Sequence, residues 1–443
     1  MMAELDVYVN DRLVGALAPA GGGAWVLAYR PGVAPSDFVS LTMPVRLESY
    51  RWSRGLPPIF LQNLPEGYQK DVIRARLGPH ADVSDPGLLA LTGHRGIGRV
   101  RVVPKGQPLG RVGAPVDLAQ ILATPDSRER LLEILQGGLV DGISGVMPKS
   151  FASGATKATA VADGWILKTA LVHLPGLAAN EYLCLEVARH AGLPVPRAEL
   201  SEDGQVLAVE RFDQLRDGRF LGVEDFCALK GLDPIEKYKG SIEDLAKIMQ
   251  LHVPADTRAQ ASQQLFKLLA LNYALRNGDA HLKNFALTYS NHADVALAPV
   301  FDVVTVTAYP DYAADTPALT LAGRKAWRVG KTLAQYAYSR LSLTPTQVRE
   351  SVGCIARAVR EVAPRVTDLA NKVPEFREPA KRLLQSWEEG VGDIAVDASG
   401  PRRLPVATSA LQAQAGLSGP GPAKRSRRKS SRNPDGPLGH KAR

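Results

Sequence analysis

The amino-terminal part of the chain has the alternating pattern of a strand-rich unit. Apolar and polar positions alternate through Val7–Val9, turn, and resume at Leu13–Gly15, and a further run covers residues 24–29. A helical pattern follows at residues 67–77. We therefore expect residues 1–105 to form a small α+β domain.

The middle of the chain changes from a linker to a compact mixed segment. Residues 106–139 hold a Pro/Gly-bearing linker and then a short helix at residues 128–135. Beyond them, Gly164–Thr169 is apolar and β-prone, and residues 180–189 have a helical pattern that ends near glycine and proline. Residues 140–215 are therefore predicted to form strands and one helix.

From residue 216 to about residue 390 the pattern is mainly helical. The clearest helix covers residues 260–276. The residues that share one face of this helix are Leu265, Leu268, Leu269 and Asn272. The leucines of that face are expected to anchor the segment that follows in the core.

The positive charge of the chain is concentrated at its end. The formal net charge is +9, and residues 401–443 hold ten Lys or Arg residues against Asp435 alone, so residues 1–400 sum to about zero. The tail, residues 391–443, is rich in Pro, Gly, Ser and Ala without apolar periodicity, which predicts disorder. Its cluster Lys424–Lys429 fits contact with nucleic acid or an acidic partner, and equally a solvated tail without a specific partner.

Composition favours a protein of the cytoplasm. At 443 residues the chain has room for more than one domain. It has no apolar run of about 18 residues that could span a membrane, and acidic residues interrupt the start, where a signal segment would lie. Cys184, Cys227 and Cys354 lack metal-ligand spacing, so a reduced compartment is the simplest interpretation. We expect cytoplasmic localisation and no membrane partner.

The segment Asn277–Asn284 has the spacing of a phosphotransfer catalytic loop. In kinases, a carboxylate that accepts a hydroxyl proton and an amide that binds Mg²⁺ are separated by four residues. Asp279 and Asn284 keep this separation, and Asp302 follows Phe301 in the order in which kinases place a second metal-binding aspartate. Alone, the Asp-x4-Asn pair is also typical of a capped turn after a helix, so the prediction depends on residues upstream.

Two upstream residues supply that support. A kinase needs a strand lysine to hold the nucleotide phosphates and a helical glutamate to orient it. Lys168 lies on the predicted strand, and Glu181 lies on the predicted helix with Leu185 and Ala188 following at helical spacing, which points Glu181 inward. A buried glutamate needs a cationic partner. Without this order along the chain, Lys168 would be interpreted as an edge-strand lysine.

Residues 141–150 are ambiguous as a phosphate loop. Their small residues would let backbone amides approach a phosphate. Pro148 stands where a Walker A loop needs glycine, and the protein-kinase pattern G-x-G-x-x-G is absent. A plain glycine-rich turn is the alternative interpretation.

Several segments together resemble the HipA family, the serine/threonine-kinase toxins of bacterial toxin–antitoxin modules. In the kinase part these are Ile143–Lys149, Asn180–Tyr182, Val209–Asp213, Asn277–Asn284 and Phe301–Asp302. In the amino-terminal part, Val7–Asn10, Leu41–Val45 and Phe60–Gly67 resemble the accessory domain of the family's longer members. The resemblance runs in order from about residue 5 to about residue 385.

The resemblance implies a role for each matching residue. Asp279 would be the catalytic base, and Asn284 and Asp302 would bind Mg²⁺. Lys168 would hold the nucleotide phosphates, with Glu181 as its orienting partner.

The resemblance also implies the rest of an ATP site. Glu210 and Phe212 would offer backbone groups to adenine, and His281 and Lys283 would lie beside the phosphates. The phosphate loop would contribute Ser144, Gly145, Val146, Met147, Pro148 and Lys149. Two positions depart from the family: Met147 replaces the usual glutamine, and Gly142 replaces a serine that many members carry. Inhibitory autophosphorylation would therefore use Ser144 or be absent.

The resemblance implies an α+β fold, in which a two-lobed protein-kinase-like core (residues 140–215 and 216–390) follows an accessory domain. The expected function is that of an ATP- and Mg²⁺-dependent serine/threonine kinase toxin whose substrate is an aminoacyl-tRNA synthetase, glutamyl-tRNA synthetase being the prototype. A DNA-binding antitoxin of the HipB type would neutralise it and link it indirectly to DNA. Two alternatives stay open: a catalytically weak corepressor or scaffold, for which Met147 and Gly142 speak, and a small-molecule kinase.

Overall fold

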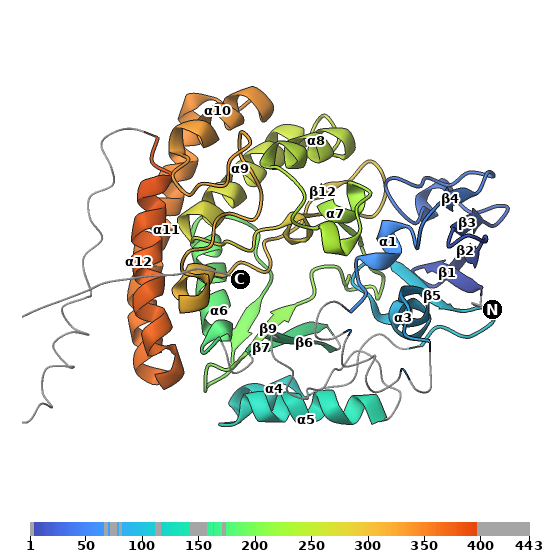
Figure 1. Ribbon diagram of the computed structural model, residues 1–443, viewed down its shortest axis with the longest axis horizontal. Helices are drawn as coiled ribbons and strands as arrows, with labels where there is room; N and C mark the ends of the chain where they lie inside the picture. Colours follow the sequence, from blue (N-terminus) through green and yellow to red (C-terminus); the bar gives the residue numbers. More distant parts are fainter. Residues whose placement is uncertain are drawn as a thin grey trace, which may run out of the picture. The chain divides into compact units, whose positions relative to one another are not determined.

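The computed structural model describes residues 4–65, 70, 78, 82–110, 117–140, 157–162, 164–170 and 174–396. All of these belong to one compact unit, Met1–Leu404. Figure 1 shows the elements in chain order, from the strands near the amino terminus to the long helices near the end of the described chain. Apart from Lys70, the helix predicted at residues 67–77 lies outside the described residues, as does the predicted phosphate loop at residues 141–150.

An antiparallel sheet forms the centre of the accessory domain. Its strands lie in the order β4-β3-β2-β1-β5. They are β1 (Leu5–Val9), β2 (Arg12–Pro19), β3 (Trp25–Tyr29), β4 (Tyr50–Trp52) and β5 (Val100–Pro104). The buried side chains of β1 pack with residues of the helices α1 (Pro58–Leu61) and α3 (Asp85–Thr92). The three strands predicted near the amino terminus are confirmed.

A second antiparallel sheet and one helix form the strand-rich lobe. The strands lie in the order β6-β7-β9-β8. They are β6 (Lys157–Ala162), β7 (Trp165–Ala170), β8 (Ala198–Leu200) and β9 (Val206–Glu210). Helix α6 (Leu177–His190) packs against β7 and β9. β7 and α6 are the strand and helix that the hydrophobic pattern predicted.

Residues 118–140 contain more helix than the predicted linker and short helix. They form α4 (Leu118–Ala123), capped by Asp117, and α5 (Ser127–Val140). Ile121 and Leu131 are buried against Leu167, Val206 and Ala208 of the sheet. These helices are therefore packed onto the strand-rich lobe. The apolar residues of α4 and α5 that join this cluster are Leu118, Ile121, Leu122, Leu131, Leu132 and Ile134.

The helical lobe begins with a short strand, β10 (Gly222–Asp225), which pairs with β11 (Ala286–Tyr289). β11 in turn pairs with β12 (Ala296–Leu297). Figure 1 shows α11 and α12 side by side, and they are in contact. The helices of this lobe are α7 (Phe226–Leu229), α8 (Ile242–His252), α9 (Arg258–Ala274), α10 (Gly330–Arg340), α11 (Pro345–Lys372) and α12 (Arg377–Asp393).

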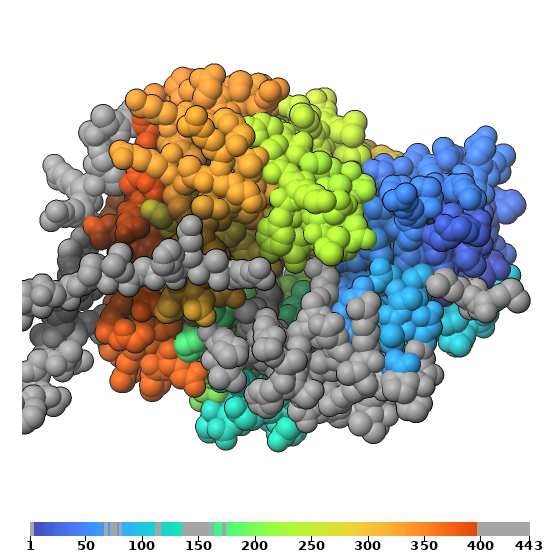
Figure 2. All heavy atoms as spheres, in the orientation of Figure 1, coloured from blue at the N-terminus to red at the C-terminus, as the bar shows by residue number. Residues whose placement is uncertain are grey.

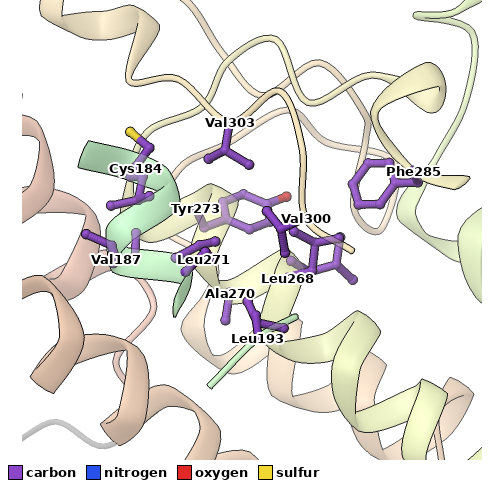
Figure 3. Packing of buried hydrophobic residues seen from close by; sticks show 14 of the residues in the cluster. Cys184, Val187, Leu193, Leu268, Ala270, Leu271, Tyr273, Phe285, Val300 and Val303 are labelled. Carbon is purple, nitrogen blue, oxygen red and sulfur yellow. The ribbon is translucent and has the colours of Figure 1, made fainter. Parts of the chain in front are cut away.

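Helix α9 forms the centre of the helical lobe. The four residues predicted to share its inner face are all buried. Figure 3 shows side chains of α9, such as Leu268 and Leu271, near Val187 of α6 and Val300 of the segment before Asp302. α9 therefore anchors both the lobe and the turn that follows it. The helix ends two residues earlier than predicted, before Arg276 adopts a left-handed backbone with φ 52°.

No helix among the described residues is long and apolar enough to cross a membrane.

Candidate active site

An ion-pair network joins three segments that are far apart in the chain. Lys168, in the middle of β7, contacts the Glu181 carboxylate from the first turns of α6. Its ammonium also donates to Asp302 Oδ1 at 3.1 Å. The side chain of Glu181 is 3% exposed and that of Lys168 is 14% exposed. A buried carboxylate is stable only when it is paired, so this contact explains why Glu181 can occupy the core-facing side of α6.

Side-chain hydrogen bonds hold the turn after α9. Asn277 donates to Asn272 Oδ1 at 2.7 Å and accepts the backbone N–H of Asp279 at 3.2 Å. Asp279 Oδ1 accepts a hydrogen bond from the Tyr238 hydroxyl at 2.7 Å. The Asp279 side chain is 43% exposed, so it is positioned by Tyr238 and still reachable from solution.

Asn284 connects the two aspartates. Its amide nitrogen donates to the backbone oxygens of Asp279 at 3.0 Å and Asp302 at 3.4 Å. Both hydrogen bonds use the nitrogen, which leaves the amide oxygen as the atom that could ligate a metal. Asp302 has φ 55°, a left-handed backbone that is uncommon for a residue other than glycine. Strained backbone conformations of this kind cluster at functional sites. Here the strained residue is the one that accepts a hydrogen bond from Lys168.

A cavity of about 460 Å³ opens beside these residues. Asp279 and Asp302 line it together with the segment from Val304 to Ala318, whereas Glu210 and Phe212 do not. Further lining residues include Tyr238, Tyr309, Tyr312, Asp315 and Lys325. The cavity therefore adjoins Asp279 and Asp302 but is not lined by the predicted adenine-binding residues.

Asp315 brings a third carboxylate to this cavity. Its backbone oxygen accepts the Trp327 indole N–H at 2.8 Å, which fixes its place. Partial burial, and then the charge of Asp279, raise the pKa of Asp315. Gly278 permits this close packing, because a Cβ there would lie 2.9 Å from Val306 and 3.4 Å from the Asp315 side chain. The cavity wall is thus fitted against the turn that carries Asp279.

The predicted hinge residues lie at the end of β9. Glu210 is exposed and pairs with Trp165 in the sheet register. The Phe212 ring packs on Phe301, with centroids 5.9 Å apart, directly before Asp302. The structure therefore brings the segment of the predicted adenine-binding residues next to the segment that carries Asp302, through these two rings.

His281 and Lys283 differ in their placement. The His281 ring is 5% exposed and meets the Tyr238 ring edge-to-face, with its Nε2 4.0 Å from Asp279 Oδ1. Lys283 reaches the accessory domain, where its ammonium donates to the backbone oxygen of Gln62 at 2.9 Å. His281 is thus beside Asp279, and the location of Lys283 beside phosphates stays a prediction. The predicted loop residues Ser144–Lys149 lie outside the described residues.

Sequence reasoning missed Asn180, Tyr238 and Asp315 as residues that shape the site. Asn180 is fully buried, donates to the Thr305 backbone oxygen and accepts the Thr305 N–H, both at 3.0 Å. It appeared in the family-like segment Asn180–Tyr182, but nothing local indicated its partner. Tyr238 and Asp315 have no motif of their own, so only the folded chain reveals them.

Substitution of Asn180 tests this link between α6 and the segment after Asp302. Asn180→Ala leaves the Thr305 N–H unpaired in the core, and an unsatisfied buried polar group costs about 1–3 kcal/mol. It also removes a hydrogen bond to the Thr305 backbone oxygen, which keeps the Ala308 N–H as a donor at 3.3 Å. We expect a loss of about 2–4 kcal/mol in the free energy of unfolding, measured by urea titration. Gln385→Ala removes only an exposed hydrogen bond to Glu389 and should leave the stability nearly unchanged. Equal stability of the two variants would contradict the assignment.

The arrangement defines a protein-kinase-like fold: a strand-rich lobe with one helix, a helical lobe, and between them a Lys–Glu–Asp network next to an Asp-x4-Asn turn. Two family models match the chain, the HipA N-terminal domain over residues 5–103 and the HipA-like C-terminal domain over residues 142–364. The chain belongs to the HipA family.

Individual relatives carry kinase names or share the fold. Two Sinorhizobium fredii proteins that are named as kinases are similar to this chain in sequence. Y4dM is 27% identical over 355 residues, which cover 72% of this chain and 81% of Y4dM. Y4mE is 28% identical over 407 residues, which cover 82% of this chain and 93% of Y4mE. A chain in the structure of the Shewanella oneidensis MR-1 complex of HipA, HipB and operator DNA matches with a TM-score of 0.62 at 17% identity, covering 87% of this chain and 97% of that one. At that identity the likeness shows the fold.

Proposed function

We propose that this protein is an ATP- and Mg²⁺-dependent serine/threonine kinase that acts as the toxin of a toxin–antitoxin module. The observation that carries the proposal is the convergence of Lys168, Glu181 and Asp302 beside the turn that holds Asp279 and Asn284. A strand lysine paired to a helical glutamate, together with an aspartate and an asparagine for metal, is the set of groups that phosphoryl transfer requires.

The donor set fits Mg²⁺ and nucleotide phosphates. Mg²⁺ prefers oxygen ligands and is bound by one or two protein groups plus substrate phosphates. The Asp302 carboxylate and the Asn284 amide oxygen are the two protein ligands that we assign. Bound Mg²⁺ would neutralise charge on the transferred phosphoryl group. Lys168 faces Asp302, so its ammonium would hold the nucleotide phosphates next to the proposed metal ligand.

Asp279 acts on the acceptor hydroxyl in this proposal. Its Oδ1 is held by Tyr238, and its other carboxylate oxygen takes the hydroxyl proton as the acceptor oxygen bonds to the γ-phosphorus. The bond from that phosphorus to the bridging oxygen breaks, and ADP leaves. Positioning of the two oxygens, with little covalent chemistry by the protein, supplies the rate enhancement.

The cavity beside Asp279 is the acceptor side of the site. Asp279 and Asp302 line this cavity of about 460 Å³ and the predicted hinge residues do not, so we assign it to the acceptor hydroxyl and the segment that carries it. A translation component such as glutamyl-tRNA synthetase, or another aminoacyl-tRNA synthetase, is the substrate that we propose. A small DNA-binding antitoxin of the HipB type would neutralise the kinase and connect it to operator DNA, as the composition of the related Shewanella complex suggests.

Substitution of Asp315 tests the acceptor side separately from the nucleotide side. Asp315→Asn removes one charge from the cavity wall, and exposed charge contacts contribute up to about 1 kcal/mol. We expect the KM for the protein acceptor to rise by up to about fivefold while the KM for ATP stays unchanged. Asp311→Asn is the matched control, because Asp311 is exposed on the same segment and does not line the cavity. A change in the ATP KM alone would place Asp315 on the other side of the site.

The proposed function is tested by labelling. Purified protein is incubated with γ-labelled ATP, Mg²⁺ and a cell lysate, and labelled proteins are identified by mass spectrometry. Asp279→Asn serves as the inactive control. Labelling of an aminoacyl-tRNA synthetase by the wild type alone supports the proposal, and the same spectra show whether Ser144 carries phosphate. Equal labelling by wild type and Asp279→Asn would refute the kinase and favour a corepressor or scaffold.

A further inference from the structure

The accessory domain docks on β10, the edge strand of the small sheet in the helical lobe. Gln62 directly follows α1, and its side-chain amide pairs with β10 as the backbone of a neighbouring strand would. Nε2 donates to the Val223 backbone oxygen at 2.8 Å, and Oε1 accepts the Asp225 N–H at 3.2 Å. These are backbone groups that β10 does not use for β11. In Figure 2 the blue atoms of the accessory domain adjoin the yellow-green atoms of the helical lobe, in agreement with the contact of α1 with α7.

A second clamp holds the same strand. Glu224 is 1% exposed, and its carboxylate accepts the Ser40 hydroxyl at 2.6 Å and the Leu41 N–H at 2.7 Å. Tyr289 of β11 also donates to this carboxylate. A buried carboxylate with three donors is a specific, satisfied contact. Docking therefore does not depend on Gln62 alone, so loss of the Gln62 side chain leaves the two parts joined.

The docked strand adjoins the metal-binding turn. β10 pairs with β11, with Asp225 opposite Ala286, and Phe226 donates its N–H to the Phe285 backbone oxygen at 2.9 Å. Ala286 is two residues after Asn284. The accessory domain also touches the turn directly, because Lys283 donates to the backbone oxygen of Gln62. One residue thus contacts both β10 and the 3₁₀ turn Leu282–Asn284.

We infer that Gln62 is a positioning residue for the metal-binding turn, so the accessory domain is a working part of the catalytic unit. Its amide fixes the Gln62 backbone on β10, and that backbone fixes Lys283 and with it the neighbouring Asn284. Asn284 in turn joins Asp279 to Asp302. The positioning is a property of the fold, and its catalytic consequence rests on the proposed function. Displacement of a reacting group by about 1 Å costs about 10²-fold in rate.

Hydrogen–deuterium exchange of the full chain tests the positioning without reference to activity. Gln62→Ala should raise amide exchange in the peptide covering residues 279–289 by about tenfold. The variant keeps the backbone oxygen that accepts from Lys283, but it loses the two side-chain hydrogen bonds that hold this backbone on β10. Asn63→Ala is the matched control: Asn63 is the next residue and its amide donates to Ile97 within the accessory domain. Equal exchange of the two variants in residues 279–289 would overturn the inference.

Kinetics test the catalytic consequence. Gln62→Ala should lower kcat by about tenfold and raise the Mg²⁺ concentration needed for half-maximal rate, with the thermal midpoint close to that of Asn63→Ala. Gln62→Glu keeps the acceptor for the Asp225 N–H and loses the donor to Val223, so its kcat should lie between those of the wild type and Gln62→Ala. In combination with Lys283→Met the losses should be less than additive. If Gln62→Ala shows raised exchange but the wild type has no kinase activity, the proposed function is refuted and the positioning is retained. Unchanged kcat in an active enzyme would refute the catalytic role of Gln62.

Discussion

Asp302→Asn should lower phosphoryl transfer by roughly 10³-fold. A metal ligand contributes several kcal/mol of charge stabilisation, and about 1.4 kcal/mol corresponds to a tenfold change in rate. The same substitution removes a carboxylate from the ammonium of Lys168, 3.1 Å away. The measurement is single-turnover transfer from γ-labelled ATP to an acceptor protein or to the chain itself. The loss should appear in the single-turnover rate constant even at saturating ATP.

The fold of the Asp302→Asn variant should be retained, because the side chain of Asp302 is 21% exposed and asparagine has the same shape. Circular dichroism and the thermal midpoint check this. Asp217→Asn is the control for removing an aspartate from an ion pair, since Asp217 pairs with Arg219 on the exposed surface. Activity within a few-fold of wild type for Asp302→Asn would reject its role as a metal ligand.

Lys168→Ala should reduce both stability and nucleotide affinity. Removing one partner of a buried ion pair leaves an uncompensated charge and costs about 3–5 kcal/mol. Here the charge left behind is Glu181, whose side chain is 3% exposed. We expect a free energy of unfolding lower by that amount in a urea titration. A calorimetric titration should show ATP binding weakened, since a phosphate-facing ammonium is lost.

Two further variants test whether the lost stability comes from the unpaired charge of Glu181. Lys168→Met combined with Glu181→Gln removes both charges, so most of the lost stability should return while ATP affinity stays low. Lys381→Ala breaks an exposed pair with Glu378 and should change stability too little to resolve. If Lys168→Ala is as stable as wild type and binds ATP equally well, Lys168 is an ordinary surface lysine of its strand.

The sequence predicted those parts of the site that depend on local spacing. Helical periodicity was sufficient to point Glu181 inward, and the strand pattern placed Lys168 in the sheet. Asp279 and Asn284 lie in one short turn, so their proximity follows from chain geometry. The accessory strands followed from alternation, because one face of their sheet is buried.

The remaining features depend on contacts across long stretches of chain. Tyr238 meets Asp279 over a separation of 41 residues, Asn180 meets Thr305 over 125, and Lys283 meets Gln62 over 221. No periodicity encodes such partners, since each residue is polar and ordinary in its own segment. Helices α4 and α5 were underestimated for a related reason: their burial comes from the sheet they cover.

The hydrogen bonds between Asn180 and Thr305 have a consequence for how such an enzyme can be switched. Asn180 precedes Glu181 on α6, and Thr305 lies three residues after Asp302. Glu181 and Asp302, the two carboxylates that face Lys168, therefore lie on segments that are hydrogen-bonded to each other. Trp387 adds a further hydrogen bond, to the Thr305 hydroxyl. Rotation of α6 away from Lys168 would displace the segment from Asp302 to Thr305 as well and would break buried contacts. Control by an outward-rotating helix is thus disfavoured in this architecture, and regulation is better placed in parts that move independently of this rigid block.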